Sequence, residues 1–146
     1  MRKAISGVDR ADVERFVERG RRAVGLRGEV NVLLARNAEI RRLNRDFRRL
    51  DKPTDVLSFP AVTGEVAGDI AISADIARRN ARQLGHSTTE EVKVLIVHGL
   101  LHLAGYDHES DSGQMRRKED RLRRSLGLPG ALIARTQRAP RKAGSR

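Results

Sequence analysis

The stretch STTEEVKVLIVHGLLHLAG, residues 87–105, contains the longest apolar run of this 146-residue chain and two of its four histidines. Ser87 and Glu90 have the spacing of a capping box, which predicts a helix that begins directly after Ser87. From Val94 to Ala104 the stretch is apolar on nearly every side, so this helix must be buried in the centre of the domain. Gly105 is expected to end it.

The segments around this central helix show the periods of further helices and strands. Val30, Val32 and Leu34 alternate as in a strand. Asn37 and Ser73 are residue types that commonly cap helices. The predicted helices run from residue 9 or 11 to 24, and over 37–50, 74–84 and 111–126; the predicted strands are 29–35, 55–59 and 68–73. This order indicates an α+β domain in which helices pack a small β-sheet around the central helix.

The length suits one domain, which we expect to cover residues 1–128. After Pro129 the chain has five basic residues and no acidic one. Residues 129–146 are therefore predicted to be a basic, mobile C-terminal tail.

The formal net charge of +11 is unevenly distributed. Residues 1–55 carry 15 basic and 9 acidic side chains, residues 56–115 carry 4 and 8, and residues 116–146 carry 11 and 2. Basic flanks of this kind attract RNA or DNA through their phosphates, although they could also serve solubility alone. With three Phe, one Tyr and no Trp, the chain is poorly suited to stacking bases.

The location expected from the sequence is the cytoplasm. The N-terminus turns charged before an apolar run develops, so no signal peptide is expected, and the apolar run around His98 is too short to cross a membrane. The absence of cysteine fits a reducing compartment and excludes thiolate metal ligands.

The spacing of three histidines predicts a metal site. His98 and His102 are four residues apart, so they lie on one face of the central helix. A turn at Gly105 can bring His108 to the same place as a third ligand. Three protein ligands with one open position are typical of catalytic zinc sites, although three imidazoles also suit nickel, cobalt and copper. The alternative, that these are ordinary core histidines, leaves two imidazoles on an apolar helix without partners.

Gly99 stands where a metzincin protease, H-E-x-x-H-x-x-G-x-x-H, has its catalytic glutamate. The missing base disfavours peptide hydrolysis, whereas cleavage of a phosphodiester depends more on neutralising charge around phosphorus. A glycine within a helix is costly, so either another element packs closely against it or the space serves a substrate. The sequence leaves both explanations open.

Two residues near the histidine motif have less definite roles. His86, the fourth histidine, fits no ligand spacing and is expected at the surface. Asp107 could orient a ligand imidazole or could cap a turn.

Three segments resemble the YbeY family of bacterial endoribonucleases that mature ribosomal RNA. They are HGLLHLAGYDH (98–108), LNRDFRRLDKPTDVLSFP (43–60) and GDIAIS (68–73), within a similarity that covers about residues 30–128. The final helix, with Met115 and Glu119, also resembles that of the family. The resemblance implies a zincin-like α+β fold with a small mixed sheet. It also implies one divalent metal ion, with zinc expected, bound by His98, His102 and His108.

The resemblance further implies the activity: a single-strand-specific, metal-dependent endoribonuclease that acts in maturation of the small-subunit rRNA 3′ end and in ribosome quality control. Its expected partners are an rRNA precursor and the small ribosomal subunit, with neither DNA nor a membrane. By its position, Arg48 matches the functional arginine of the family, whose proposed role is to hold or neutralise the scissile phosphate. Without the resemblance, Arg41, Arg45 and Arg49 are equally good candidates for that role. The alternatives are a metzincin-like metallopeptidase and a noncatalytic ribosome-assembly factor whose metal only stabilises the fold.

Overall fold

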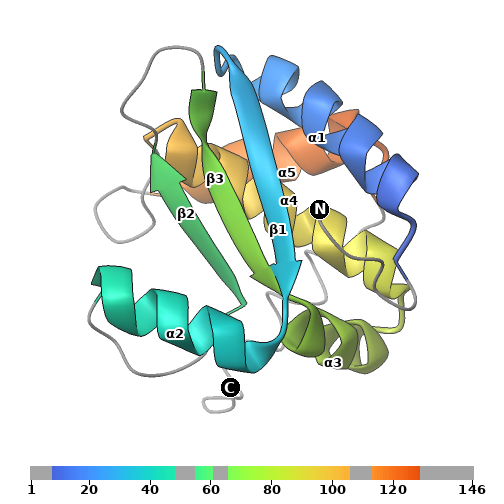
Figure 1. The fold of residues 1–146 in the computed structure, drawn as a ribbon. Coiled ribbons are helices and arrows are strands. Elements are labelled where there is room, and N and C mark those ends of the chain that lie inside the picture. Colours follow the sequence, from blue (N-terminus) through green and yellow to red (C-terminus); the bar gives the residue numbers. More distant parts are fainter. Residues whose placement is uncertain (1–7, 49–54, 61–65, 106–112, 129–146) are drawn as a thin grey trace.

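The computed structural model describes residues 8–48, 55–60, 66–105 and 113–128. These residues form five helices and a three-stranded sheet, so the predicted α+β class is confirmed (Figure 1). In chain order the elements are α1 (Arg10–Val24), β1 (Glu29–Ala35), α2 (Asn37–Arg48), β2 (Val56–Pro60), β3 (Val66–Ser73), α3 (Ala74–Leu84), α4 (Thr88–Leu103) and α5 (Gln114–Ser125). The predicted C-terminal tail and the predicted start of the last helix at residue 111 lie outside the described residues.

The sheet is mixed, with the strand order β1-β3-β2. The central strand β3 runs parallel to β1, with Leu34 opposite Ile72, and antiparallel to β2, with Leu57 opposite Ala71. Successive side chains of a strand point to opposite faces, so both faces of this sheet carry apolar residues. A sheet with two apolar faces needs helices on both sides.

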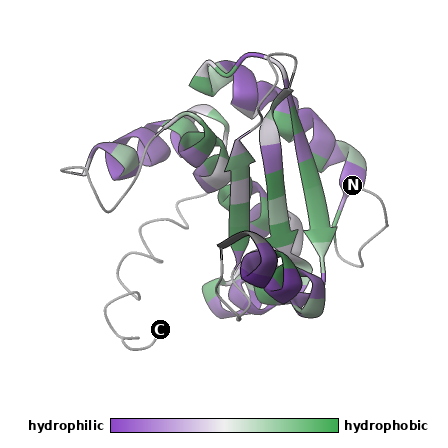
Figure 2. Cartoon of the chain, turned by 60° about the vertical axis from the view of Figure 1, so that its left-hand side comes forward, coloured by the Kyte–Doolittle hydropathy of each residue, from purple (hydrophilic) through white to green (hydrophobic). Residues whose placement is uncertain are grey.

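Helix α2 covers one face of the sheet, and α1, α4 and α5 pack on the other. On the α2 side, Ile40 packs with Ala35, Leu57 and Ala71. Figure 1 shows α4 and α5 passing behind the strands, and Figure 2 shows how apolar the strands are. The larger cluster on the α4 side joins residues of α1, β1, β3, α4 and α5, among them Phe16, Val32, Ile70, Ile96, Leu100 and Met115.

Helix α4 is the buried centre of the domain, as predicted. Its buried residues are Glu91, Val92, Val94, Leu95, Ile96, Val97, Gly99, Leu100 and Leu101. Gly99 packs directly against β3: a Cβ added there would lie 2.9 Å from Ile70 Cδ1 and 3.1 Å from its Cγ2. Ser58 Oγ on β2 also donates a hydrogen bond to Gly99 O at 3.2 Å. Close packing, and not space for a substrate, therefore explains this glycine.

Most of the predicted helix ends are confirmed. Ser87 and Glu90 form both halves of a capping box, and Ser73 caps α3, which ends at Gly85 in the left-handed conformation. Two ends differ by a residue. Asn37 is the first residue of α2 and not its cap, and Ala104 is the C-cap of α4, so that Gly105, with φ of 99°, follows the cap.

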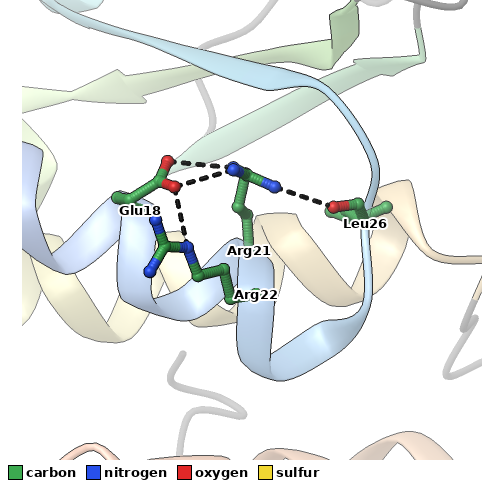
Figure 3. Close-up of polar contacts among 4 residues, drawn as sticks. All are labelled: Glu18, Arg21, Arg22 and Leu26. Carbon is green, nitrogen blue, oxygen red and sulfur yellow. Dashed lines mark hydrogen bonds and ion pairs between the residues drawn. The ribbon is translucent and has the colours of Figure 1, made fainter.

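The end of α1 is tied to the sheet by polar contacts around Glu18 (Figure 3). The Glu18 carboxylate accepts hydrogen bonds from Arg21 at 2.7 and 2.9 Å and from Arg22 at 3.0 Å. Arg21 Nη1 also donates to Leu26 O at 3.1 Å, just before β1. The hydrogen bonds from Arg21 lower the pKa of Glu18, with smaller contributions from the charges of Arg21 and Arg22, against an opposing effect of desolvation.

The expectation that His86 lies at the surface is wrong. Its side chain is only 7% exposed, and its Nε2 lies 2.8 Å from Oε1 of Glu91, which is fully buried. Asn80 Nδ2 lies 3.4 Å from the other oxygen of Glu91. The His86 side chain is buried because it lies against Glu91 in the first turn of α4, a contact that its place in a loop does not indicate.

No helix in the described residues combines the length and the apolar character that a membrane span requires.

Candidate metal centre

His98 and His102 project from the same side of α4, in the last two turns of the helix. Their Nε2 atoms are 3.1 Å apart, and their ring centroids are 4.7 Å apart at an interplanar angle of 70°. The His98 side chain is 28% exposed, so the pair is accessible at the edge of a buried helix. The i, i+4 spacing in the sequence therefore does bring these two imidazoles together.

This geometry fits the binding of one metal ion between the two rings. Two nitrogens that each lie about 2.0–2.1 Å from one zinc ion at a tetrahedral angle are about 3.3–3.4 Å from each other. The observed 3.1 Å between His98 Nε2 and His102 Nε2 is close to that value. In the described part of the chain no third His, Asp or Glu completes a metal site with this pair.

A carboxylate from another helix lies on the opposite side of the His98 ring. Glu119 Oε1 of α5 is 3.6 Å from His98 Nδ1, and Arg123 Nη1 is 3.8 Å from Glu119 Oε2. Both of these α5 side chains are buried, with 7% of Glu119 and 3% of Arg123 exposed. The packing of α5 on α4 therefore places an ionic pair beside the first histidine.

Several predicted site residues lie wholly or partly outside the described residues. His108 and Asp107 fall in the segment between Gly105 and Gly113, and Arg49 follows the described end of α2. Arg48 is the last residue of α2; its backbone is described, but its side chain is not. These assignments stay predictions.

Glu119 is the residue of this centre to which sequence reasoning assigned no role, although it belongs to the final helix that resembles the family's. A signal was present: it stands four residues after Met115 and three before Leu122, on the apolar stripe of α5. A carboxylate on the buried face of an amphipathic helix needs a partner. The pattern of one helix, however, does not indicate which other helix provides that partner.

Comparison with known proteins identifies the family. A family model described as Endoribonuclease YbeY matches residues 8–127. This chain belongs to the YbeY family. Proteins named Endoribonuclease YbeY from Koribacter versatilis and Solibacter usitatus are 52% and 47% identical to it; the alignments cover 100% and 93% of this chain, and 96% and 92% of theirs. The solution structure of TM1509 from Thermotoga maritima is 34% identical, with a TM-score of 0.59 over 80% of this chain and 79% of that one.

The exposed arginines of this YbeY-family chain differ in how they are neutralised. On α1, Arg10 pairs with Glu14 and Arg22 pairs with Glu18. Helix α5 also exposes Arg116, Arg121 and Arg124. Within the described residues these three have no carboxylate at ion-pair distance. Helix α5, which packs on α4, therefore exposes three arginines that form no ion pair within the described residues.

Proposed function

We propose that this chain is a metal-dependent endoribonuclease that cleaves single-stranded RNA. The observation that carries the proposal is the pair of imidazole Nε2 atoms 3.1 Å apart on α4, in a chain whose relatives are named Endoribonuclease YbeY. His98 and His102, with His108 as the third ligand, would hold one divalent ion, for which zinc is well suited. Such an ion, when bound, supplies positive charge for the reacting phosphodiester.

The chain's own residues would bind and orient the RNA strand. In this proposal Arg48, the last residue of α2, donates hydrogen bonds to the scissile phosphate and offsets its charge during cleavage. The exposed arginines of α5 bind flanking phosphates, and RNA in addition carries a 2′-hydroxyl as an internal nucleophile.

The natural substrate that we propose is a precursor of small-subunit rRNA, cut near its 3′ end. The same activity would serve quality control of ribosomes, with the small ribosomal subunit as a partner and the cytoplasm as the location. The catalytic unit is residues 1–128, a zincin-like domain, and residues 129–146 add a basic tail. A phosphate-directed surface could also hold DNA, but DNA has no 2′-hydroxyl and is not proposed as a substrate.

The packing of Gly99 argues against the alternative of a metallopeptidase. A glutamate there would place its Cβ 2.9 Å from Ile70 Cδ1, so the general base of that enzyme class could be accommodated only if Ile70 or its surroundings moved. The remaining alternative is a noncatalytic assembly factor, which would not cleave RNA whether or not the metal is bound.

Cleavage of a single-stranded RNA that spans the 3′ end of the small-subunit rRNA tests the proposal. The zinc-loaded wild type should cut it, whereas the chelated protein and His102→Ala should lose at least about 100-fold in rate because the metal charge is lost. Arg15→Ala, at an exposed position of α1, is the matched control and should keep full activity. Equal cutting by all four samples would reject the metal site, and cutting by none would favour the assembly factor.

A further inference from the structure

We propose that Glu119 is a positioning residue, which holds the His98 imidazole with its proton on Nδ1 and thereby leaves Nε2 able to bind a metal ion. The inference rests on the metal site of the proposed function. It adds a residue that lies on a different helix from the two histidines of α4.

The two ring nitrogens of His98 have different neighbours. Nε2 faces His102 Nε2 at 3.1 Å, whereas Nδ1 faces Glu119 Oε1 at 3.6 Å. Glu119 therefore lies on the side of the ring away from the proposed metal position and is not itself a ligand there. At 3.6 Å the contact is an ion-pair contact and is longer than the usual ~2.9 Å of a hydrogen bond.

The chemistry of imidazole connects this contact to metal binding. A neutral imidazole carries one proton, and only the nitrogen without that proton can donate electrons to a metal. An ionised carboxylate accepts hydrogen bonds and does not donate them, so Glu119 favours the proton on Nδ1. His98 Nε2 is then free of its proton and faces His102. Metal-binding histidines commonly have such an acceptor on the other nitrogen.

The burial of Glu119 indicates a role beyond packing. Glu119 is buried, and its neighbours Met115 and Leu122 on the same face of α5 are buried apolar residues. Replacing a buried ion pair by apolar residues of similar volume often leaves a protein equally stable or makes it more stable. Arg123 Nη1 lies 3.8 Å from one carboxylate oxygen of Glu119, and the other oxygen lies on the side of His98.

Glu119→Gln is the sharpest variant for a test, with Asp120→Asn as its matched control. Gln has the size of Glu but can donate from its amide to an unprotonated Nδ1, so the preference for one tautomer is lost. Asp120, the next residue of α5, is partly exposed, and its substitution removes the same charge. Glu119→Leu combined with Arg123→Leu is a second variant, which replaces both members of the buried pair by apolar residues if Glu119→Gln does not fold.

Zinc affinity of the whole protein, measured by competition with a chromogenic chelator, should fall about 10- to 100-fold in Glu119→Gln. Asp120→Asn should stay within about twofold of the wild type, because such a surface charge changes electrostatics only weakly. Equal affinities for the two variants would overturn the proposal. So would a loss of stability in metal-free Glu119→Gln without a change in zinc affinity, since that outcome describes a structural residue only.

The tautomer of His98 can be observed without metal and without RNA. At about pH 8.5, above the ordinary imidazole pKa of about 6.5, ¹⁵N chemical shifts show which ring nitrogen carries the proton. The wild type should have it on Nδ1, and Glu119→Gln should not retain that preference. A wild-type proton on Nε2 would overturn the proposal whatever the variants do. A wild type that binds no zinc would contradict the proposed function, while the tautomer would still decide the role of Glu119.

Discussion

Residues 98 and 99 are neighbours in the chain but lie on different sides of α4. His98 faces His102, and Gly99 packs on Ile70 of β3. A side chain at position 99 would press on Ile70, so the packing of α4 on β3 would have to change. The glycine that takes the place of a protease glutamate is thus part of the packing that positions the metal ligands.

Gly99→Ala should destabilise the protein although alanine is the better helix former. Overpacking a tight core costs about 1–3 kcal/mol, and the gain in helix propensity is only about 1 kcal/mol. We expect a net loss of about 1–2 kcal/mol in the free energy of unfolding, measured by urea denaturation of the metal-free protein. Adding Ile70→Val removes the atom at 2.9 Å and should recover part of the loss. Gly99→Ala at wild-type stability would show that β3 yields easily.

Arg48→Ala should lower kcat for RNA cleavage by about 100- to 1,000-fold with little change in KM, because its guanidinium is proposed to act on charge that develops in the transition state. Arg45→Ala is the matched control, since Arg45 is an exposed arginine of the same helix. It should reduce cleavage less than about threefold, as expected for a surface charge. Equal losses in the two variants would remove the special role of Arg48 and leave a general effect of positive charge.

The start and the burial of helix α4 were predicted correctly, because their determinants are local in sequence. Ser87 and Glu90 define its start, and its apolar composition indicates burial. The position of His86 could not be predicted in the same way. Its contact with Glu91 joins residues only five apart, but the burial of this pair depends on the packing of α3, whose Asn80 lies against the same carboxylate.

At the level of α1, the contacts of Glu18 predict a contribution to stability that depends on pH. Since folding lowers the pKa of Glu18 below its ordinary value of 4.5, mainly through hydrogen bonds from Arg21, the contribution is present above pH 4.5. It is lost as the pH falls through the lower folded value. Glu18→Gln should therefore be less stable than the wild type at about pH 7 and equally stable near about pH 2.

Urea midpoints of the two proteins across this pH range measure the difference. Glu14→Gln is the control, because Glu14 accepts from Arg10 alone and both of these side chains are at least half exposed. It should show a smaller gap than Glu18→Gln at neutral pH, because an exposed single ion pair contributes little. A gap for Glu18→Gln that persists unchanged into acid would mean that the carboxylate's charge is not its cause.

For the molecule as a whole, the sequence predicted the elements better than their arrangement. The periodicity of residues 29–35, 55–59 and 68–73 located all three described strands to within two residues. The parallel pairing of β1 with β3 and the contact of Glu119 with His98 join segments far apart in the chain. Local patterns do not contain such contacts, because they arise from the packing of whole elements.

The proposal that the exposed arginines of α5 bind RNA can be tested against those of α3. Arg116→Gln combined with Arg121→Gln on α5 should lower the salt dependence of single-stranded RNA binding, by about 0.7 in the slope of log K against log [salt] per lost phosphate contact. Fluorescence anisotropy across a range of salt concentrations measures this slope. The control is Arg79→Gln combined with Arg82→Gln, which removes the same charge from exposed positions of α3. Helix α3 leads into the start of α4, whereas His102 lies near the end of α4. Because counterions are released only where phosphates are contacted, the α3 pair should leave the slope unchanged. Equal reductions for both pairs would mean that net charge, and not the α5 surface, attracts the RNA.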